Sequence, residues 1–459
     1  MTAPFVALAL SLAVAQAVPA PEAKGSLPSP AKAPAESVKQ WATEVAGMFM
    51  SGKLDGIASR FDPRLATLLS PEAFQDGWKG IEQKNGKLKS IGAPVLKDAG
   101  PLDIAVMAAA FEKVEWTLGV AFDVQGRITS LRFTPMSPNA AANAPPPVEY
   151  RAPPYAEPKK FRDSAVKFGD EKWPLPGTIS MPAGKGPFPG VVLVHGSGPL
   201  DQDETVGGTK VFRDLAWGLA SQGIAVLRYD KRTRVHGDKV GSAPMTVKDE
   251  VIDDALAAVA TLRQTPGVNP RRIAVLGHSL GGYLVPRIAA ADKHLAGVIA
   301  LAGSTRPVHE LIQDQLDYLV ENGAAREEDV APMRADAAAI QAIDPAKTPP
   351  AGRVMGAPPS YWLDLKSYKP AVLAHLNAIP ILVLQGGRDY QVTSKDLDGW
   401  KKELAGDKFA TFKVFPRANH FFVYGEGKSL PVEVMKPGNV DGEVVQTIAK
   451  WVKGLPPAK

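Results

Sequence analysis

The chain has 459 residues, of which 45% are hydrophobic and 22% are charged, proportions typical of a soluble globular protein with a sizeable core. The net charge of +5 is small for this length, and the absence of any long run of Lys or Arg argues against a nucleic-acid-binding protein. Because the chain contains no cysteine, disulfides, thiolate zinc sites and a cysteine nucleophile are all excluded.

The first 17 residues predict a removable secretory leader. They carry no charged side chain, and the apolar stretch at residues 5–15 runs into Ala15-Gln16-Ala17, a small-x-small cleavage pattern. This stretch is too short to span a bilayer, so we expect an exported protein, periplasmic or secreted, without a membrane span. A disordered Ala-rich tail is the alternative, because the segment before residue 5 lacks Lys and Arg. Residues 18–36 are predicted to be a disordered spacer.

Residues 37–134 predict a small α+β domain. Ser37 is placed to cap a helix that ends near Ser51, and Ser70-Pro71-Glu72 has the pattern of a second helix start. Strand-like segments follow, the clearest being residues 114–122 and 127–133, which a Gly-containing turn joins. Helices followed by an antiparallel sheet define this domain, and a Pro/Ala-rich linker is predicted at residues 135–154.

Residues 155–459 predict a large α/β domain. Short apolar strands are expected at residues 191–194, 224–227, 273–276 and 379–384, and helical patterns separate them. Continuous apolar strands that alternate with helices are typical of a mostly parallel, doubly wound sheet with both faces covered. The polar, mostly helical stretch at about 304–376 interrupts this alternation and is predicted to be an inserted lid.

The strongest chemical signal is Gly277-His278-Ser279-Leu280-Gly281, which matches the G-x-S-x-G pattern of a nucleophile elbow. It follows the strand predicted at residues 273–276 and precedes a helical run. In an elbow the serine lies on a sharp strand-to-helix turn, and the helix N-terminus places a positive dipole end where negative charge develops. We therefore predict that Ser279 is a nucleophile; a plain packing turn is the alternative.

Two later positions supply the partners that such a serine needs. An elbow serine is followed along the chain by an Asp or Glu and then by a His. Asp389 lies in a Gly-rich turn after the strand predicted at residues 379–384, and His420 is the only histidine beyond it. We predict that His420 is the base and that Asp389 holds its tautomer. The alternatives are a helix cap at Asp389 and an ordinary loop histidine at 420.

A glycine-rich turn, His195-Gly196-Ser197-Gly198-Pro199, directly follows the strand predicted at residues 191–194. Such a turn can direct backbone N–H groups at one point, and a tetrahedral oxyanion is held by one of them together with the N–H of the residue after the nucleophile. We predict that Ser197 and Leu280 are the two donors of this oxyanion hole, with Gly198 as the alternative to Ser197.

Two further segments have more than one interpretation. The acid-rich run Asp201-Gln202-Asp203-Glu204 is predicted to be solvated loop charge, with ordering of the pocket rim or cation binding as the alternatives. Pro358-Pro359-Ser360-Tyr361-Trp362 lies in the predicted lid, where its aromatic rings would either line an acyl pocket or pack in the lid core. Neither H-E-x-x-H nor a Walker-type glycine loop is present, so we expect no metal and no cofactor.

These motifs together resemble those of bacterial α/β-hydrolase-fold serine esterases. The resemblance rests on the segments at residues 191–231, 277–282, 387–389 and 419–421 and extends over about residues 160–455. Residues 38–134 look like a small domain of unknown function that precedes some of these esterases. The resemblance implies an α/β-hydrolase fold, a carboxylesterase acting on short acyl esters, and no cofactor. Gln202 departs from it, since Arg is expected there.

The predicted function is therefore hydrolysis of a small-molecule carboxylic ester through an acyl-enzyme intermediate. A serine peptidase, or an acyltransferase or thioesterase, is the alternative enzyme, because the same triad serves amides and acyl carriers. A non-enzymatic alternative is a wall- or ligand-binding protein that acts through residues 38–134. The sequence does not indicate an oligomeric state.

Overall fold

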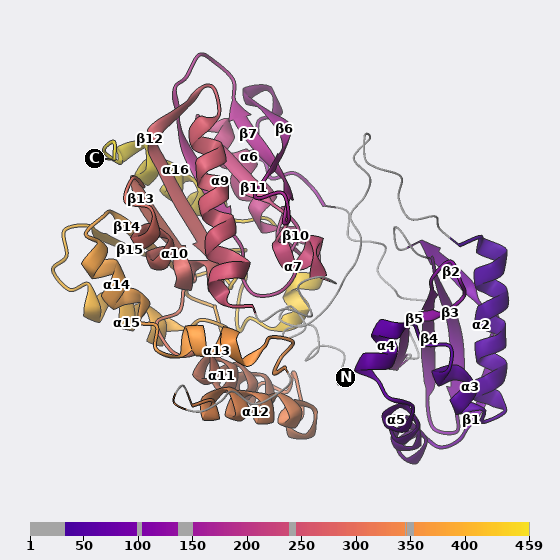
Figure 1. Ribbon diagram of the computed structural model, residues 1–459. Coiled ribbons are helices and arrows are strands. Elements are labelled where there is room, and N and C mark those ends of the chain that lie inside the picture. The colour runs from indigo at the N-terminus through magenta and orange to yellow at the C-terminus, as the bar shows by residue number, and fades with distance from the viewer. Residues whose placement is uncertain are drawn as a thin grey trace. The chain divides into compact units, whose positions relative to one another are not determined.

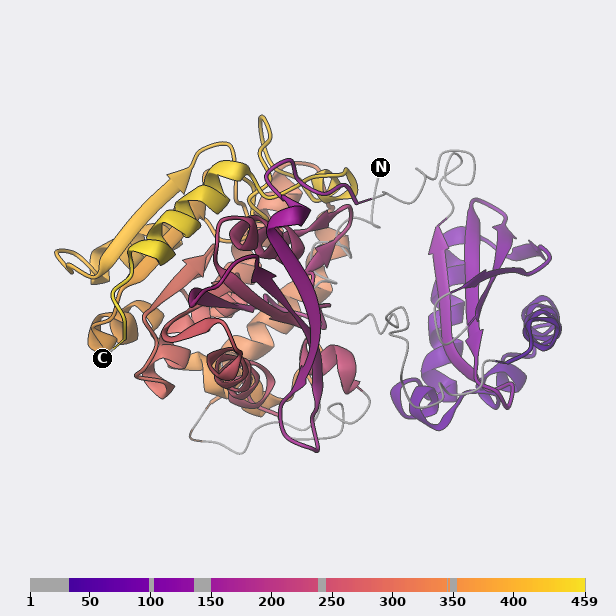
Figure 2. The ribbon, with the colours of Figure 1, turned by 90° about the horizontal axis from the view of Figure 1, so that it is seen from above.

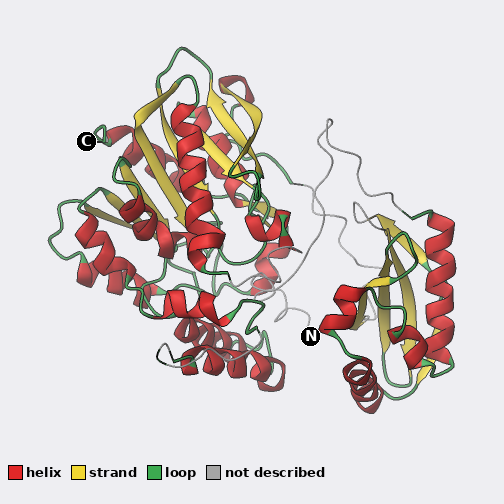
Figure 3. Cartoon of the chain, in the orientation of Figure 1, coloured by secondary structure: helices red, strands yellow, loops and turns green. Residues whose placement is uncertain are grey.

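The computed structural model describes residues 33–98, 103–135, 150–237, 245–344, 346 and 353–458 (Figure 1; helices and strands are distinguished in Figure 3). The predicted leader lies outside these residues, as do nearly all of the predicted spacer and most of the predicted linker. The chain divides into two compact units, one within Val18–Pro146 and the other within Pro147–Lys459. They are called here the N-terminal unit and the C-terminal unit.

The N-terminal unit consists of helices followed by an antiparallel sheet. Every fourth or third residue of its first helix is buried, and these side chains join the core with the apolar residues of the strands. This helix begins at Ala35, so Ser37 lies in its first turn and the predicted cap at Ser37 is wrong; Pro34 occupies the cap position. The elements are α2 (Ala35–Met50), α3 (Leu54–Ala58), α4 (Pro63–Leu68), α5 (Pro71–Asn85), β1 (Leu88–Ile91), β2 (Val95–Asp98), β3 (Asp103–Phe111), β4 (Glu115–Phe122) and β5 (Ile128–Pro135).

An eight-stranded sheet forms the centre of the C-terminal unit. Its strand order is β15-β14-β13-β12-β8-β11-β7-β6, and all neighbours are parallel except β7, which is antiparallel to both β11 and β6. The fold predicted from the sequence, a mostly parallel sheet, is confirmed. The strands are β6 (Phe161–Phe168), β7 (Leu175–Pro182), β8 (Phe188–Val194), β11 (Ala225–Tyr229), β12 (Val268–His278), β13 (Gly297–Leu301), β14 (Ile381–Gly386) and β15 (Ala410–Phe415).

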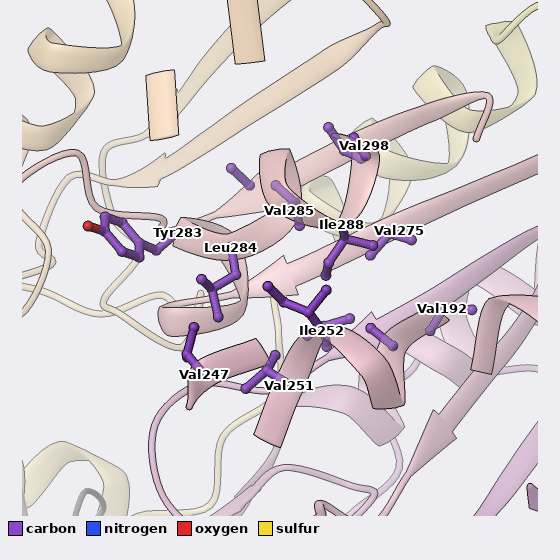
Figure 4. Packing of buried hydrophobic residues seen from close by; sticks show 14 of the residues in the cluster. Val192, Val247, Val251, Ile252, Val275, Tyr283, Leu284, Val285, Ile288 and Val298 are labelled. Carbon is purple, nitrogen blue, oxygen red and sulfur yellow. The ribbon is translucent and has the colours of Figure 1, made fainter. Parts of the chain in front are cut away.

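Helices cover both faces of this sheet (Figures 1 and 2). Helices α9 (Asp253–Gln264) and α10 (Leu280–Ala291) contribute to the core on one face, and α6 (Val211–Ser221) and α16 (Gly442–Gly454) contribute to the core on the other. Alternate residues of each strand point to opposite faces of the sheet. Because helices cover both faces, the residues of the central strands are buried on either side. Figure 4 shows the first of these cores, in which side chains of α10 pack on those of β12 and β13.

The segment between β13 and β14 is helical, as the sequence predicts. It holds α11 (Val308–Glu321), α12 (Glu327–Ala342), α13 (Pro359–Lys366) and α14 (Pro370–Asn377), and it is called here the insertion. Its first residues are tied to α15 (Ser394–Glu403), because the buried Asp396 carboxylate accepts hydrogen bonds from Ser304 and from the Thr305 N–H. In the part of the chain that the structure describes, no helix combines the length and the apolar character that crossing a bilayer requires.

Shorter elements complete the C-terminal unit. Two of them, α7 and η2, lie between β11 and α9, and η2 carries Glu250, which contacts Lys231. These elements are η1 (Pro158–Lys160), β9 (Thr205–Val206), β10 (Thr209–Lys210), α7 (Arg232–Val235), η2 (Lys248–Ile252) and η3 (Pro431–Met435).

Candidate active site

Ser279 lies at the junction of β12 and α10, in a strained backbone conformation. Its φ is +53° and its ψ is −114°, values that L-residues rarely adopt. The surrounding structure stabilises this conformation: the Ser279 N–H donates to the carbonyl oxygen of Leu301 at 2.9 Å, and its carbonyl oxygen accepts from the Tyr283 N–H at 2.9 Å. The side chain is partly exposed at the start of α10, where a nucleophile would have to be.

The glycines around Ser279 are required by close packing. A Cβ atom on Gly277 would lie 2.2 Å from the backbone of Gly281, and one on Gly281 would lie 2.2 Å from the carbonyl oxygen of Val194. No side chain fits at such distances. The G-x-S-x-G pattern therefore allows β12 to turn sharply into α10 while α10 approaches the end of β8.

Asp389 and His420 form a buried hydrogen-bonded pair. The Oδ2 atom of Asp389 lies 2.8 Å from Nδ1 of His420, and both side chains are almost inaccessible to solvent. The other carboxylate oxygen, Oδ1, accepts from the N–H groups of Gln391 and Val392. With Nδ1–H donated to the carboxylate, Nε2 is the ring nitrogen left to accept a proton. This is the orientation that a general base requires.

His278, the residue before Ser279, connects the elbow to the His420 segment. Its Nε2 atom lies 3.0 Å from the carbonyl oxygen of His420, and the two imidazole rings have centroids 4.8 Å apart. The structure therefore brings the segments that carry Ser279 and His420 into contact. The sequence indicates no role for His278, because nothing in its local pattern distinguishes a core histidine from a connecting one.

The loop after β8, residues 195–200, lies directly against Ser279 and is called here the β8 loop. A Cβ atom on Gly196 would lie 3.2 Å from the Ser279 Cβ, a tight contact that would require a neighbour to move by a few tenths of an ångström. The Gly196 N–H already donates to Glu204 at 2.9 Å. Among the described residues, neither the Ser197 nor the Gly198 N–H donates a hydrogen bond, and Ser197 is exposed. Leu280 is the first residue of α10, so its N–H has no partner within the helix.

The acid-rich run after the β8 loop is not solvated, contrary to the prediction. Asp203 and Glu204 are 4% and 1% exposed. Asp203 pairs with Arg228 at 3.1 Å and with Lys210 at 3.1 Å. The prediction rested on the fact that charged residues in a loop are normally exposed. It fails because the cations that pair with Asp203 lie outside the run, where its sequence gives no sign of them.

The other two residues of this run are partly buried. Asp201 accepts from the N–H and the hydroxyl of Thr205 at 2.9 and 2.7 Å. Gln202, where the esterase resemblance leads us to expect Arg, accepts from the Thr178 hydroxyl at 2.7 Å and donates its N–H to Asp230. The neutral side chain of Gln202 therefore connects the loop at residues 201–204 to β7.

Glu204 is a buried residue beside the candidate site that no sequence motif indicated. Its Oε2 atom lies 3.0 Å from Nδ1 of His278, within ion-pair distance, although the angles are not those of a hydrogen bond and neither atom has a hydrogen-bond partner in the described part of the chain. Its Oε1 atom holds the Gly196 N–H. One buried carboxylate thus lies between the β8 loop and the elbow, and the backbone of Glu204 is left-handed, with a φ of +47°.

The charges of this pair stabilise each other. Burial opposes a charge on the His278 ring, but the Glu204 carboxylate outweighs it and raises the pKa of His278 above its usual value of 6.5. Burial likewise opposes the Glu204 charge, but His278 lowers the pKa of Glu204 below its usual 4.5. His195 differs: burial lowers its pKa to about 4, so it is neutral at pH 7 and donates from Nε2 to the Asp201 carbonyl oxygen.

We expect Glu204→Gln to destabilise the C-terminal unit by about 3 kcal/mol, because it leaves a buried imidazolium without its counter-charge. The contribution of the charged His278 to the free energy of unfolding is present below pH 6.5 and is lost as the pH rises through its raised pKa. The contribution of the charged Glu204 to the free energy of unfolding is present above pH 4.5 and is lost as the pH falls through its lowered pKa. Urea denaturation across this range should therefore give the largest difference from the unmodified chain between pH 4.5 and 6.5.

The control is Glu157→Gln, which breaks an exposed pair with Lys160. Its effect should stay below about 1 kcal/mol, because exposed pairs are screened by solvent. A difference for Glu204→Gln that does not change with pH would show that the pair is uncharged.

The aromatic residues predicted in the lid pack in the core of the protein. Tyr361 and Trp362 on α13 are buried, and the Trp362 Nε1–H donates to the Val354 carbonyl oxygen at 3.0 Å. Of the two alternatives left open, the structure therefore favours core packing. In the described ranges, no group of three or more His, Asp or Glu side chains is arranged as a set of metal ligands.

Comparisons with known proteins show the family to which the chain belongs. Residues 191–430 match the family described as "Alpha/beta hydrolase family", and residues 42–131 match a "Protein of unknown function (DUF3887)". The chain is 39% identical over 384 residues to Esterase EstD of Thermotoga maritima, a match that covers 84% of this chain and 88% of the relative.

Solved structures that resemble the chain include an esterase of Pyrococcus furiosus, with 18% identity, a TM-score of 0.42, and coverage of 68% of this chain and 97% of that chain. An acylaminoacyl peptidase of Pyrococcus horikoshii has 14% identity and a TM-score of 0.46, with coverage of 79% and 56%.

Proposed function

The chain belongs to the alpha/beta hydrolase family and is a carboxylesterase-like hydrolase, and from this premise we propose that it cleaves carboxylic esters through an acyl-enzyme on Ser279. The observation that carries the proposal is the buried Asp389–His420 pair, held against the elbow that presents Ser279. A nucleophile, a base and a group that orients the base are the three parts that covalent catalysis by serine requires.

The first half of the reaction forms the acyl-enzyme. Nε2 of His420 takes the proton of the Ser279 hydroxyl while Oγ attacks the ester carbonyl carbon, which becomes tetrahedral. The Asp389 carboxylate stabilises the resulting imidazolium. The imidazolium then returns its proton to the leaving alkoxide, the C–O bond of the ester breaks, and the alcohol departs. In the second half, water attacks the acyl-enzyme with the same assistance, and the acid and free Ser279 result.

The negative oxygen of each tetrahedral intermediate would be held by the N–H groups of Ser197 and Leu280, with Gly198 as the alternative to Ser197. The N–H groups of Ser197 and Gly198 have no partner among the described residues, and that of Leu280 has none within its helix. Donors that are already oriented, near the positive end of α10, stabilise the developing charge without reorganisation.

Labelling with a fluorophosphonate tests the nucleophile directly. Attack by Ser279 on phosphorus expels fluoride and leaves a stable phosphonyl ester, so one label per chain is expected. Trypsin releases residues 273–287 as one peptide, in which Ser279 is the only serine, so mass spectrometry identifies the site without ambiguity. A label on any other residue, or no label on protein that hydrolyses esters, would contradict the proposal.

We propose esters of short-chain acids as substrates, because the motifs resemble those of bacterial esterases and because the relative over most of the chain is an esterase. Hydrolysis rates of p-nitrophenyl acetate, butyrate, octanoate and laurate, measured beside peptide p-nitroanilides, separate this proposal from the peptidase alternative. The kcat/KM value is expected to be highest for acetate or butyrate. Faster cleavage of the anilides would favour the peptidase.

A further inference from the structure

A buried lysine binds the peptide unit that contains a proposed oxyanion donor. Lys231 follows β11 and is 2% exposed, and its ammonium donates to the carbonyl oxygen of Gly196 at 2.9 Å. The Gly196 carbonyl and the Ser197 N–H belong to the same peptide group. The lysine therefore contacts one end of the group whose other end is proposed to bind the oxyanion.

The geometry of a peptide makes this contact informative. The group is planar and trans, so its C=O and N–H bonds point in opposite directions. An ammonium fixed on the Gly196 oxygen therefore directs the Ser197 N–H away from Lys231. A positive charge on the carbonyl also draws electron density from the nitrogen and strengthens the N–H as a donor, because linked hydrogen bonds polarise one another.

Gly196 is held from both sides by charged groups of opposite sign. The Glu204 carboxylate accepts its N–H, and the Lys231 ammonium donates to its C=O. Burial of two charges is costly, and closing a turn would need only neutral backbone partners. Arg228, which is equally buried and lies three residues earlier, shows the contrast: its guanidinium bonds to the side chains of Asp163, Ser180 and Asp203.

Lys231 is in turn positioned by a carboxylate that contacts the insertion. Oε1 of Glu250, on η2, lies 3.2 Å from the lysine Nζ. The other oxygen, Oε2, accepts from the Tyr361 hydroxyl at 2.8 Å, and Tyr361 belongs to α13 of the insertion. A chain of buried contacts thus runs from Tyr361 through Glu250 and Lys231 to the Gly196–Ser197 peptide.

We propose that Lys231 is a positioning residue that orients and polarises the Ser197 N–H for oxyanion binding, and that Glu250 and Tyr361 tie this function to the insertion. The inference rests on the proposed function, because an oxyanion forms only if Ser279 attacks an acyl carbon. Lys231 does not touch the substrate. Its effect therefore appears in the transition state and leaves ground-state binding of the ester unchanged.

The variant that tests this is Lys231→Met combined with Glu250→Gln. Methionine keeps the length of the side chain without its charge, and glutamine avoids a buried carboxylate without a partner. We expect kcat to fall by about 10²-fold with KM nearly unchanged, because loss of one oxyanion donor typically costs 10²- to 10³-fold. Lys231→Arg keeps the cation and should recover most of kcat.

A second measurement distinguishes weaker oxyanion binding from a general loss of structure. An aryl trifluoromethyl ketone forms a hemiketal with the serine and places its negative oxygen in the oxyanion hole. Its Ki should rise by about the same factor as kcat falls, since transition-state analogues report transition-state interactions. The control Arg228→Met also removes a buried cation; it should lower the melting temperature but leave the ratio of Ki to KM unchanged.

Tyr361→Phe keeps the proposal testable if the charge variants do not fold. It removes one hydroxyl from the chain of contacts, and a fall in kcat of about three- to ten-fold with unchanged KM is expected if the lost hydrogen bond weakens Glu250 as a partner. Tyr155→Phe is the matched control, because its hydroxyl is also bound within the C-terminal unit, to the Val440 carbonyl oxygen, and contacts none of these residues.

The outcomes distinguish this inference from the proposed function. If Ser279 reacts with the fluorophosphonate but the folded charge variants and Tyr361→Phe leave kcat and Ki within two-fold of the unmodified chain, the role of Lys231 is wrong and the esterase stands. Equal losses in kcat for Lys231→Arg and the methionine variant would also overturn it. If Ser279 is unreactive, the proposed function fails first.

Discussion

Replacement of Ser279 by alanine should lower kcat for p-nitrophenyl acetate by about a million-fold, and His420→Ala should cost nearly the same. Each change removes the same event, the attack of an activated hydroxyl, because neither the nucleophile nor the base is effective alone. Both variants should bind the ester with a KM near that of the unmodified chain wherever residual turnover can be measured.

The double variant makes this test sharper. If Ser279 and His420 act as one unit, removal of both should cost no more than removal of either. Losses that multiply would show that the two residues act independently. Ser197→Ala is the control: it removes the other exposed serine hydroxyl of the site but keeps the backbone N–H, so kcat should change only a few-fold.

Asp389→Asn should lower kcat by about 10⁴-fold with little change in structure. The reason lies in the hydrogen bonds at the other oxygen. Oδ1 accepts from two backbone N–H groups, those of Gln391 and Val392, so the amide oxygen must take that position and the amide NH₂ must face Nδ1 of His420. A donor at this place forces Nδ1 to accept, puts the proton on Nε2, and removes the base.

Asp214→Asn is the matched control for this prediction. Asp214 is another fully buried carboxylate of the C-terminal unit, and it accepts from the Tyr150 hydroxyl and the Val440 N–H. The substitution Asp214→Asn should leave kcat unchanged. The measurement is kcat from steady-state kinetics, on variants whose circular dichroism spectrum is native. A loss in kcat of less than ten-fold for Asp389→Asn would show that Asp389 does not hold the base.

The part of the site that the sequence predicts is carried by local signals. Ser279 and Asp389 each follow a strand that could be recognised from its apolar run, at β12 and β14, and His420 lies in the loop after β15. Parallel strands that run in the same direction bring the loops at their carboxyl ends to one edge of the sheet. Recognition of the strands was therefore enough to predict that these residues lie at one edge of the sheet.

What only the tertiary structure decided is the charge network beneath the site. Glu204 and Lys231 bind Gly196 across gaps of 8 and 35 residues, and Glu204 reaches His278 from a loop that looked solvated. The sequence by itself determined the fold class and predicted the order along the chain of the proposed nucleophile, acid and base, because hydrophobic periodicity and turn motifs act over a few residues. Whether a charged side chain is buried depends on partners that only folding brings near, and no local pattern records them.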